Sequence, residues 1–210
     1  MIFHMIGDSH TCSFSGTDNY NRYESLCPPF VIHSMIPIQA CHIGNDAPLG
    51  QQFFQVVENI SRNEMVIPVL GEIDIRTDIA QRYDQIHLDN AIAPTLELFQ
   101  KGVIKLLEIN RNVALLSPFP INKTYGNPEM CYGPLSVNHQ ICLRYDEMLD
   151  DLARHLGLVH LTITKQIFDQ GVYLDKHNYI DWCHIYGSVV RRLLAPQFLE
   201  YFGVDICPLK

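Results

Sequence analysis

Short apolar runs alternate with longer helix-period segments along this chain, and the alternation strongly limits the folds open to it. The apolar runs lie at residues 2–6, 34–43, 65–70, 113–116 and 158–163. Segments with apolar residues three and four positions apart lie at residues 51–62, 90–110, 136–156 and 185–202. Strands that alternate with helices are typical of a parallel sheet covered by helices on both faces. We therefore predict an α/β fold, a three-layer α/β/α sandwich around a five-stranded parallel sheet.

The length of the chain sets the expected number of domains. A chain of 210 residues suits one domain with a single substantial core, so we predict one domain over residues 1–210. Pro37 lies inside the second apolar run. Because proline cannot donate to a sheet ladder, we expect this run to be an edge strand or a bent strand.

The composition indicates a folded acidic protein and excludes two classes of partner. Hydrophobic residues make up 47% of the chain and charged residues 18%, close to globular averages, so disorder is not expected. The 15 basic residues against 23 acidic ones give a net charge of −8, which offers no cationic field to nucleic acid or an anionic membrane surface. No apolar run reaches the roughly 18 residues of a membrane span. We expect neither nucleic acid nor a membrane as a partner.

The cysteines and the first residues of the sequence bear on the compartment. The seven cysteines are odd in number, and the absence of a Cys-x-x-Cys pair gives no support to a zinc ribbon or thioredoxin-like site. The first apolar run has no basic residues before it and breaks at Gly7, which indicates a strand rather than a signal peptide. Reduced thiols in the cytoplasm are the simplest interpretation.

Unusual polar residues follow the expected strands, where a site would form. In parallel sheets the functional groups lie on loops beyond the carboxyl ends of the strands. The loops with such residues are Gly-Asp-Ser-His at 7–10, Gly-Glu-Ile-Asp at 71–74 and Asp-Trp-Cys-His at 181–184. The spacing of Asp181 and His184 lets the acid orient the imidazole, whose other nitrogen then accepts a proton from the Ser9 hydroxyl. This is the arrangement of an activated nucleophile.

These motifs resemble the blocks of the SGNH (GDSL) hydrolase superfamily, in the same order along nearly the whole chain. Gly-Asp-Ser at 7–9 matches the first block, Asp181 and His184 match the last, and Gly44 is the best match to the lone glycine of the second. The resemblance implies a flavodoxin-like fold and a serine esterase that needs no metal or organic cofactor. It implies that Ser9 is the nucleophile, His184 the general base and acid, and Asp181 the residue that orients His184. The N–H groups of Ser9 and Gly44 would then donate to the oxyanion.

The third block of the family departs from its usual form in this chain. The family has Gly-x-Asn-Asp, whereas residues 71–74 place Ile73 at the asparagine position. Isoleucine has no donor, so another side chain is needed for the oxyanion. Asn45 is our preferred candidate, since it carries the same amide, although supporting its own turn is an equal alternative. Arg76 is the other candidate, unless Glu72 pairs with it.

Other interpretations remain open at this stage. Asp8 and His10 form the Asp-x-His that opens calcineurin-like metallophosphoesterases, in which two metals need further ligands. Residues 71–76 and 43–46 imitate the later motifs of that family incompletely. A non-catalytic carbohydrate-binding relative of the fold is a third interpretation. Capping of the last helix is the ordinary structural alternative for Asp181.

The substrate expected from the sequence is a small-molecule or carbohydrate ester with a small acyl group, such as an O-acetylated sugar. The chain has no long apolar flap for an acyl tail. Candidates for substrate contact are His10, Asp74 and Arg76, although for His10 a hydrogen bond within its turn is the alternative. The irregular segment 118–134 adds polar and aromatic groups suited to the face of a sugar, namely Asn122, Lys123, Tyr125, Asn127 and Tyr132.

Overall fold

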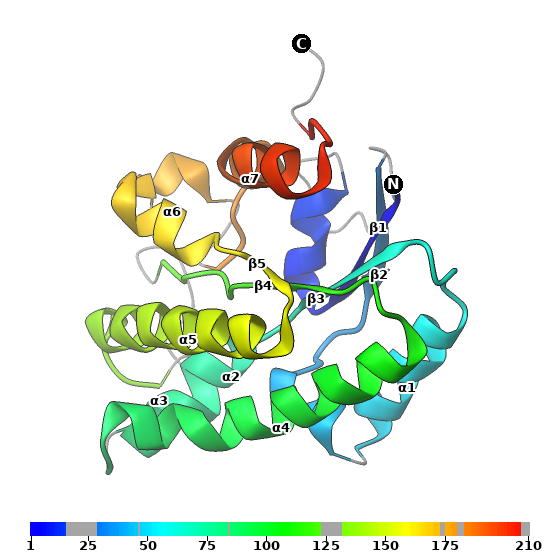
Figure 1. Cartoon of the computed structure of the whole chain (residues 1–210). Coiled ribbons are helices and arrows are strands. Elements are labelled where there is room, and N and C mark those ends of the chain that lie inside the picture. Colours follow the sequence, from blue (N-terminus) through cyan, green and yellow to red (C-terminus); the bar gives the residue numbers. More distant parts are fainter. Residues whose placement is uncertain are drawn as a thin grey trace.

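The computed structural model describes residues 1–15, 29–45, 47–83, 85–122, 132–172, 175–179 and 183–206 (Figure 1). Its strands are β1 (Phe3–Gly7), β2 (Phe30–Ser34), β3 (Met65–Val69), β4 (Ala114–Leu116) and β5 (Val159–Leu161). The longer helices are α1 (Pro48–Glu58), α4 (Leu88–Ile109), α5 (Leu135–Leu156), α6 (Thr164–Asp169) and α7 (Gly187–Phe202). The 3₁₀ turns are η1 (Ser9–Phe14), η2 (Ala40–Gly44) and η7 (Lys176–Asn178). A continuous helical run after β3 consists of α2 (Glu72–Asp74), the π-helical η3 (Ile75–Ile79) and α3 (Ala80–Tyr83).

The paired strands run parallel, in a sheet of three with the order β2-β1-β3 and a sheet of two, β4-β5. The sequence predicts one five-stranded sheet, whereas in the described residues one isolated parallel bridge, from Val66 to Val113, connects β3 with β4. Val66 donates its N–H to the carbonyl oxygen of Asn112 at 2.8 Å. The next residue of β3 that faces β4 is Pro68, which has no N–H to donate. The ladder between the two sheets is therefore interrupted.

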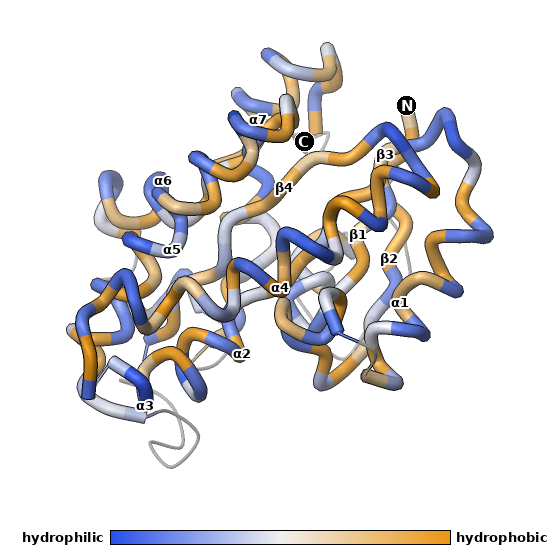
Figure 2. The backbone as a smooth tube through the Cα atoms, turned by 60° about the horizontal axis from the view of Figure 1, so that its bottom comes forward, coloured by the Kyte–Doolittle hydropathy of each residue, from blue (hydrophilic) through white to orange (hydrophobic). Residues whose placement is uncertain are grey.

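Alternate residues of the strands face two separate apolar layers. Phe3 and Met5 of β1 belong to a core with residues of η1, α6 and α7, whereas Ile6 belongs to a core with residues of α1, α4 and α5. Figure 1 shows α6 and α7 on one side of the strands and α1, α4 and α5 on the other. In Figure 2 the strands β1, β3 and β4 are coloured as apolar, as expected for parallel strands covered on both faces. The layering is α/β/α.

The second apolar run does not form the strand predicted over residues 34–43. β2 lies earlier in the chain, and beyond it Met35 donates its N–H to the carbonyl oxygen of Gly7 at 2.6 Å. Pro37 then has no N–H with which to extend the pairing. The rest of the run folds into η2 and is partly buried against α4.

The predicted helices agree with the structure except at α1. The bounds of α4, α5 and α7 lie within two residues of the predicted segments. α1 begins at Pro48 instead of residue 51, because proline is well suited to the first helical position, where an N–H has no intrahelical partner. The helical run of residues 72–83 and the short α6 were not predicted.

Parts of two irregular segments, 16–28 and 123–131, fall outside the described residues. The roles predicted for Lys123, Tyr125 and Asn127 therefore stay predictions. Among the described helices, none combines the length and the apolar character that a membrane span requires.

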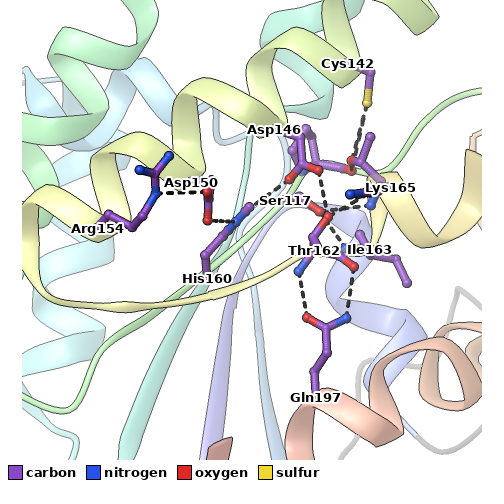
Figure 3. A network of polar contacts seen from close by, with 12 residues as sticks. Ser117, Cys142, Asp146, Asp150, Arg154, His160, Thr162, Ile163, Lys165 and Gln197 are labelled. Carbon is purple, nitrogen blue, oxygen red and sulfur yellow. Dashed lines mark hydrogen bonds and ion pairs between the residues drawn. The ribbon is translucent and has the colours of Figure 1, made fainter.

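A polar network fixes the end of β5 between α5 and α7 (Figure 3). Thr162 donates its hydroxyl proton to Asp146 at 2.7 Å, and its main-chain groups pair with the side-chain amide of Gln197 at 2.9 and 3.0 Å. His160 lies between Asp146 and Asp150, with N···O distances of 3.1 and 3.2 Å. The network ties the second sheet to helices of both outer layers.

Candidate active site

Ser9 is the first residue of η1, two positions beyond the carboxyl end of β1. Gly7 lets this turn pass close to β3, because a Cβ on Gly7 would lie 1.9 Å from the carbonyl oxygen of Val69. Asp8 caps η1 by accepting the main-chain N–H of His10 at 2.8 Å. The Gly-Asp-Ser sequence therefore forms a tight turn that leaves Ser9 half-buried.

His184 reaches the same place from the other end of the sequence. Its Nε2 lies 2.7 Å from Ser9 Oγ, and only 7% of His184 is exposed. It precedes α7, whose first residue, Gly187, packs against η1 so closely that a Cβ would lie 2.6 Å from the carbonyl oxygen of Ser13. An unprotonated imidazole nitrogen at this distance can accept the hydroxyl proton and make Ser9 a nucleophile.

The third residue of the predicted triad, Asp181, lies outside the described residues. Its orienting role therefore stays a prediction. On the Nδ1 side of His184 the structure places the buried thiol of Cys183, with Sγ 3.3 Å from Nδ1. The structure thus brings together two of the three predicted triad residues, Ser9 and His184.

His10 is buried within the site, with 1% of its surface exposed. Its Nδ1 lies 2.9 Å from Asp8 Oδ1, and its Nε2 lies 3.1 Å from the carbonyl oxygen of Cys183. Its ring stacks between Phe119 and His184, with centroid distances of 5.0 and 4.9 Å. Burial alone would lower the pKa of His10, but the attraction of Asp8 and a second buried carboxylate raises the pKa to about 9. The hydrogen bond within the turn, which was the alternative to substrate contact for His10, is present.

Glu72 is the second buried carboxylate. Its Oε1 forms an ion pair with Nε of Arg76 at 2.9 Å, and Glu72 is 3% exposed. Burial raises the pKa of Glu72, while the cations of His10 and Arg76 oppose that rise. Asp8, His10, Glu72 and Arg76 thus form a largely buried cluster in which each basic side chain lies against an acidic one.

The residues predicted for the oxyanion hole make structural contacts of their own, and their role toward an oxyanion stays a prediction. Gly44 packs against α4, where a Cβ would lie 1.6 Å from a main-chain carbonyl oxygen. Asn45 is exposed, and its Oδ1 accepts the main-chain N–H two residues further on at 2.9 Å, which is the turn-supporting role. Arg76 pairs with Glu72. The N–H of Ser9, another predicted donor, lies at the start of η1 beside the Ser9 hydroxyl.

Asp74 supports the loop after β2. It is fully buried, and its carboxylate accepts the N–H groups of Ala40 at 2.7 Å and Cys41 at 3.3 Å. Burial raises the pKa of Asp74, and these two hydrogen bonds lower it in turn. The structure therefore uses this candidate for substrate contact as a strut between two loops.

Two groups of described side chains have donor atoms close enough to share a cation, within 4.8 Å of one another: Asp8, His10 and Glu72, and His10, Cys183 and His184. In both groups the nitrogens of His10 face acceptors, so a metal would have to displace a proton. In the second group the two imidazole planes lie 29° apart and face each other, whereas a metal lies in the plane of a ring that binds it. The residues fit a hydrogen-bonded site better than a metal centre.

Comparisons with known proteins identify the fold. No protein-family model and no curated protein matches the sequence. Among solved structures, the acetylxylan esterase Axe2 from Geobacillus stearothermophilus aligns over 99% of this chain and 96% of its own, with a TM-score of 0.61 and 13% identity. The carbohydrate acetylesterase Est24 from Sinorhizobium meliloti aligns over 91% and 93%, with a TM-score of 0.57 and 12% identity.

A third structure carries the name of the motif itself. A member of the lipolytic protein G-D-S-L family from Veillonella parvula aligns over 97% of this chain and 98% of its own, with a TM-score of 0.52 and 14% identity. The chain therefore has the fold of the SGNH (GDSL) hydrolases.

Proposed function

We propose that this chain is a serine esterase that removes a small acyl group, such as an O-acetyl group on a carbohydrate. The observation that carries the proposal is the contact of 2.7 Å between Ser9 Oγ and His184 Nε2. The carbohydrate acetylesterases among the structural neighbours support the substrate class. Two of the Axe2 structures are of catalytic mutants in which a serine or an aspartate is replaced by alanine. Ser9 and Asp181, to which we assign catalytic roles here, are a serine and an aspartate as well.

In the proposed reaction, Ser9 Oγ attacks the acyl carbon while His184 Nε2 takes the hydroxyl proton. The N–H of Ser9 donates to the oxyanion, and His184 returns the proton to the leaving alcohol. Water then attacks the acyl-enzyme with His184 as the base, which releases the acid and restores Ser9. Asp181 holds the ring of His184 in the orientation that these transfers need. No cofactor takes part in these reaction steps.

Part of the segment proposed to face a sugar can be located. Asn122 is buried, whereas Tyr132, shortly before α5, is 41% exposed and offers an aromatic surface. Lys123, Tyr125 and Asn127 lie outside the described residues. We propose Tyr132 as the residue on which a sugar ring stacks.

The test combines a covalent probe with a substrate series. A fluorophosphonate should label Ser9, as located by peptide mass spectrometry, and p-nitrophenyl acetate should be cleaved faster than the palmitate ester. Ser9→Ala should abolish both, whereas Ser61→Ala, which changes an exposed serine, should leave both unchanged.

Two results would overturn the proposal. A folded wild-type protein that the probe leaves unlabelled would indicate a non-catalytic relative of the fold. Phosphoesterase activity that a chelator removes and manganese restores would indicate a metallophosphoesterase that uses Asp8 and His10.

A further inference from the structure

His10 connects the two loops that carry the reacting side chains. One ring nitrogen faces the carboxylate of Asp8, in the turn of Ser9, and the other faces the carbonyl oxygen of Cys183, immediately before His184. A carbonyl oxygen can only accept a hydrogen bond, and an ionised carboxylate can only accept as well. With Asp8 ionised, both nitrogens of His10 donate and its ring is an imidazolium, which agrees with the raised pKa of His10.

The faces of the ring are occupied as well as its edges. His10 stacks on His184 with 29° between the planes and on Phe119 with 23° between the planes. His184 thus lies against a ring that is itself fixed by hydrogen bonds at both nitrogens. The position of the proposed base depends on His10 through a main-chain contact at Cys183 and a side-chain contact at the ring.

We propose that His10 is the positioning residue of the catalytic base, a clamp that holds the loop of His184 against the turn of Ser9. The inference rests on the proposed function, because it assigns a purpose to the distance between Ser9 and His184. With 1% of its surface exposed, His10 acts through those two residues and not by touching the substrate.

The surrounding charges allow the clamp to be cationic at neutral pH. The groups that face His10 are Asp8 from its own turn, Glu72 from α2, and Cys183 and His184 from the loop before α7. The attraction of Asp8, and to a smaller extent of Glu72, favours the charged form of His10 beside the charge that His184 gains in the reaction. Above the pKa of His10, about 9, the ring keeps one proton and loses one of its two hydrogen bonds.

The decisive measurement is the rate at which a fluorophosphonate labels Ser9, followed from pH 6 to 10.5. We expect the wild-type labelling rate to reach a plateau and then to fall above a pH of about 9, where His10 loses one of its two hydrogen bonds. His10→Gln should lower the plateau by about 100-fold, the typical cost of misplacing a reacting group, and should remove the alkaline fall. With an ester substrate, kcat should fall while KM changes little.

Two control variants separate the clamp from its surroundings. Cys183→Ala removes the thiol beside His184 but keeps the main-chain acceptor of His10, so the alkaline fall should persist. Phe119→Leu removes one stacking face and no hydrogen bond, so it should also keep the fall. Loss of the alkaline fall in Cys183→Ala would overturn the inference. An unchanged labelling rate in folded His10→Gln would overturn it as well.

A spectroscopic test needs no variant and so does not depend on folding of a mutant. In ¹⁵N-labelled wild-type protein at pH 7.5, His10 should show both ring nitrogens protonated, and a neutral tautomer would overturn the inference. Failure of the proposed function has a different signature, since wild-type Ser9 would then be unlabelled at every pH.

Discussion

The carboxylate of Asp74 accepts the main-chain N–H of Ala40 at 2.7 Å, which fastens the loop after β2 to the helical run after β3. Asp74→Ala would leave the N–H groups of Ala40 and Cys41 without this acceptor. We expect a loss of about 1–3 kcal/mol in the free energy of unfolding, measured by urea denaturation. Asp78→Ala is the matched control, because it removes a less buried aspartate on the same helical run. Equal losses in the two variants would contradict the role of Asp74.

Ser9→Ala and His184→Ala should each remove nearly all esterase activity, and the double variant should cost little more, because the two residues act as a unit. Asp181→Asn should cost less, since neighbours can hold part of the ring orientation. Steady-state kinetics on the best p-nitrophenyl ester would show this pattern. Additive losses in the double variant would indicate that the two side chains act separately.

The raised pKa of His10 links its protonation to stability. A base whose folded pKa is raised from 6.5 to about 9 stabilises the fold fully below 6.5 and loses that contribution as the pH rises through 9. This contribution to the free energy of unfolding is about 3 kcal/mol at most, because a difference of one in pKa corresponds to about 1.36 kcal/mol. The unfolding free energy of wild type should therefore fall between pH 6.5 and 9.5 by more than that of His10→Gln. Parallel curves for the two proteins would show that His10 is neutral in the fold.

The variant Gly44→Ala can distinguish a role of Gly44 in packing from a role in the oxyanion hole. A Cβ at this position would lie 1.6 Å from the carbonyl oxygen of Leu98, so Gly44→Ala should destabilise the protein by the roughly 1–3 kcal/mol of an overpacked core, or more. Thermal and urea unfolding would report it. A stable Gly44→Ala protein with a much lower kcat would instead support the predicted role of Gly44 in the oxyanion hole.

The network around Thr162 gives a prediction far from the proposed reaction. Thr162→Val removes the hydroxyl that donates to the buried carboxylate of Asp146, and it should cost about 1–3 kcal/mol of unfolding free energy. Thr162→Ser keeps the hydroxyl and should recover most of the loss, while labelling of Ser9 stays unchanged in both folded variants. An equally large loss of unfolding free energy in Thr162→Ser would show that the hydroxyl alone does not account for the contribution of Thr162.

Most of the layered fold could be predicted from periodicity, because strands and helices bury different spacings of apolar residues. β3, β4 and β5 lie within the predicted runs at 65–70, 113–116 and 158–163. The run at 34–43 was misassigned, because its apolar residues are buried without a ladder and the hydrogen bonds of Ala40 and Cys41 go to a side chain 33 or more residues away. Pro68 was the available signal for the interruption beside β3, since it removes a donor from the strand.

The site was predictable where short motifs carry it and not where long-range packing does. Gly-Asp-Ser and Asp-x-x-His pointed to Ser9 and His184, which the structure places in contact. The packing of η2 against α4 at Gly44 could not be predicted from the order of the motifs in the sequence. The buried state of His10 depends on Phe119 and Cys183, both more than a hundred residues away.

The contact between Ser9 and His184 spans 175 positions, and α7 follows it in the chain. Contacts of such long range form late, because a large loop must close before they contribute. During synthesis, Ser9 is made 175 positions before His184, its proposed base. A chain that ends or is cut between the two residues therefore has a serine without that base. If the proposed function holds, ester cleavage begins only after this contact has formed.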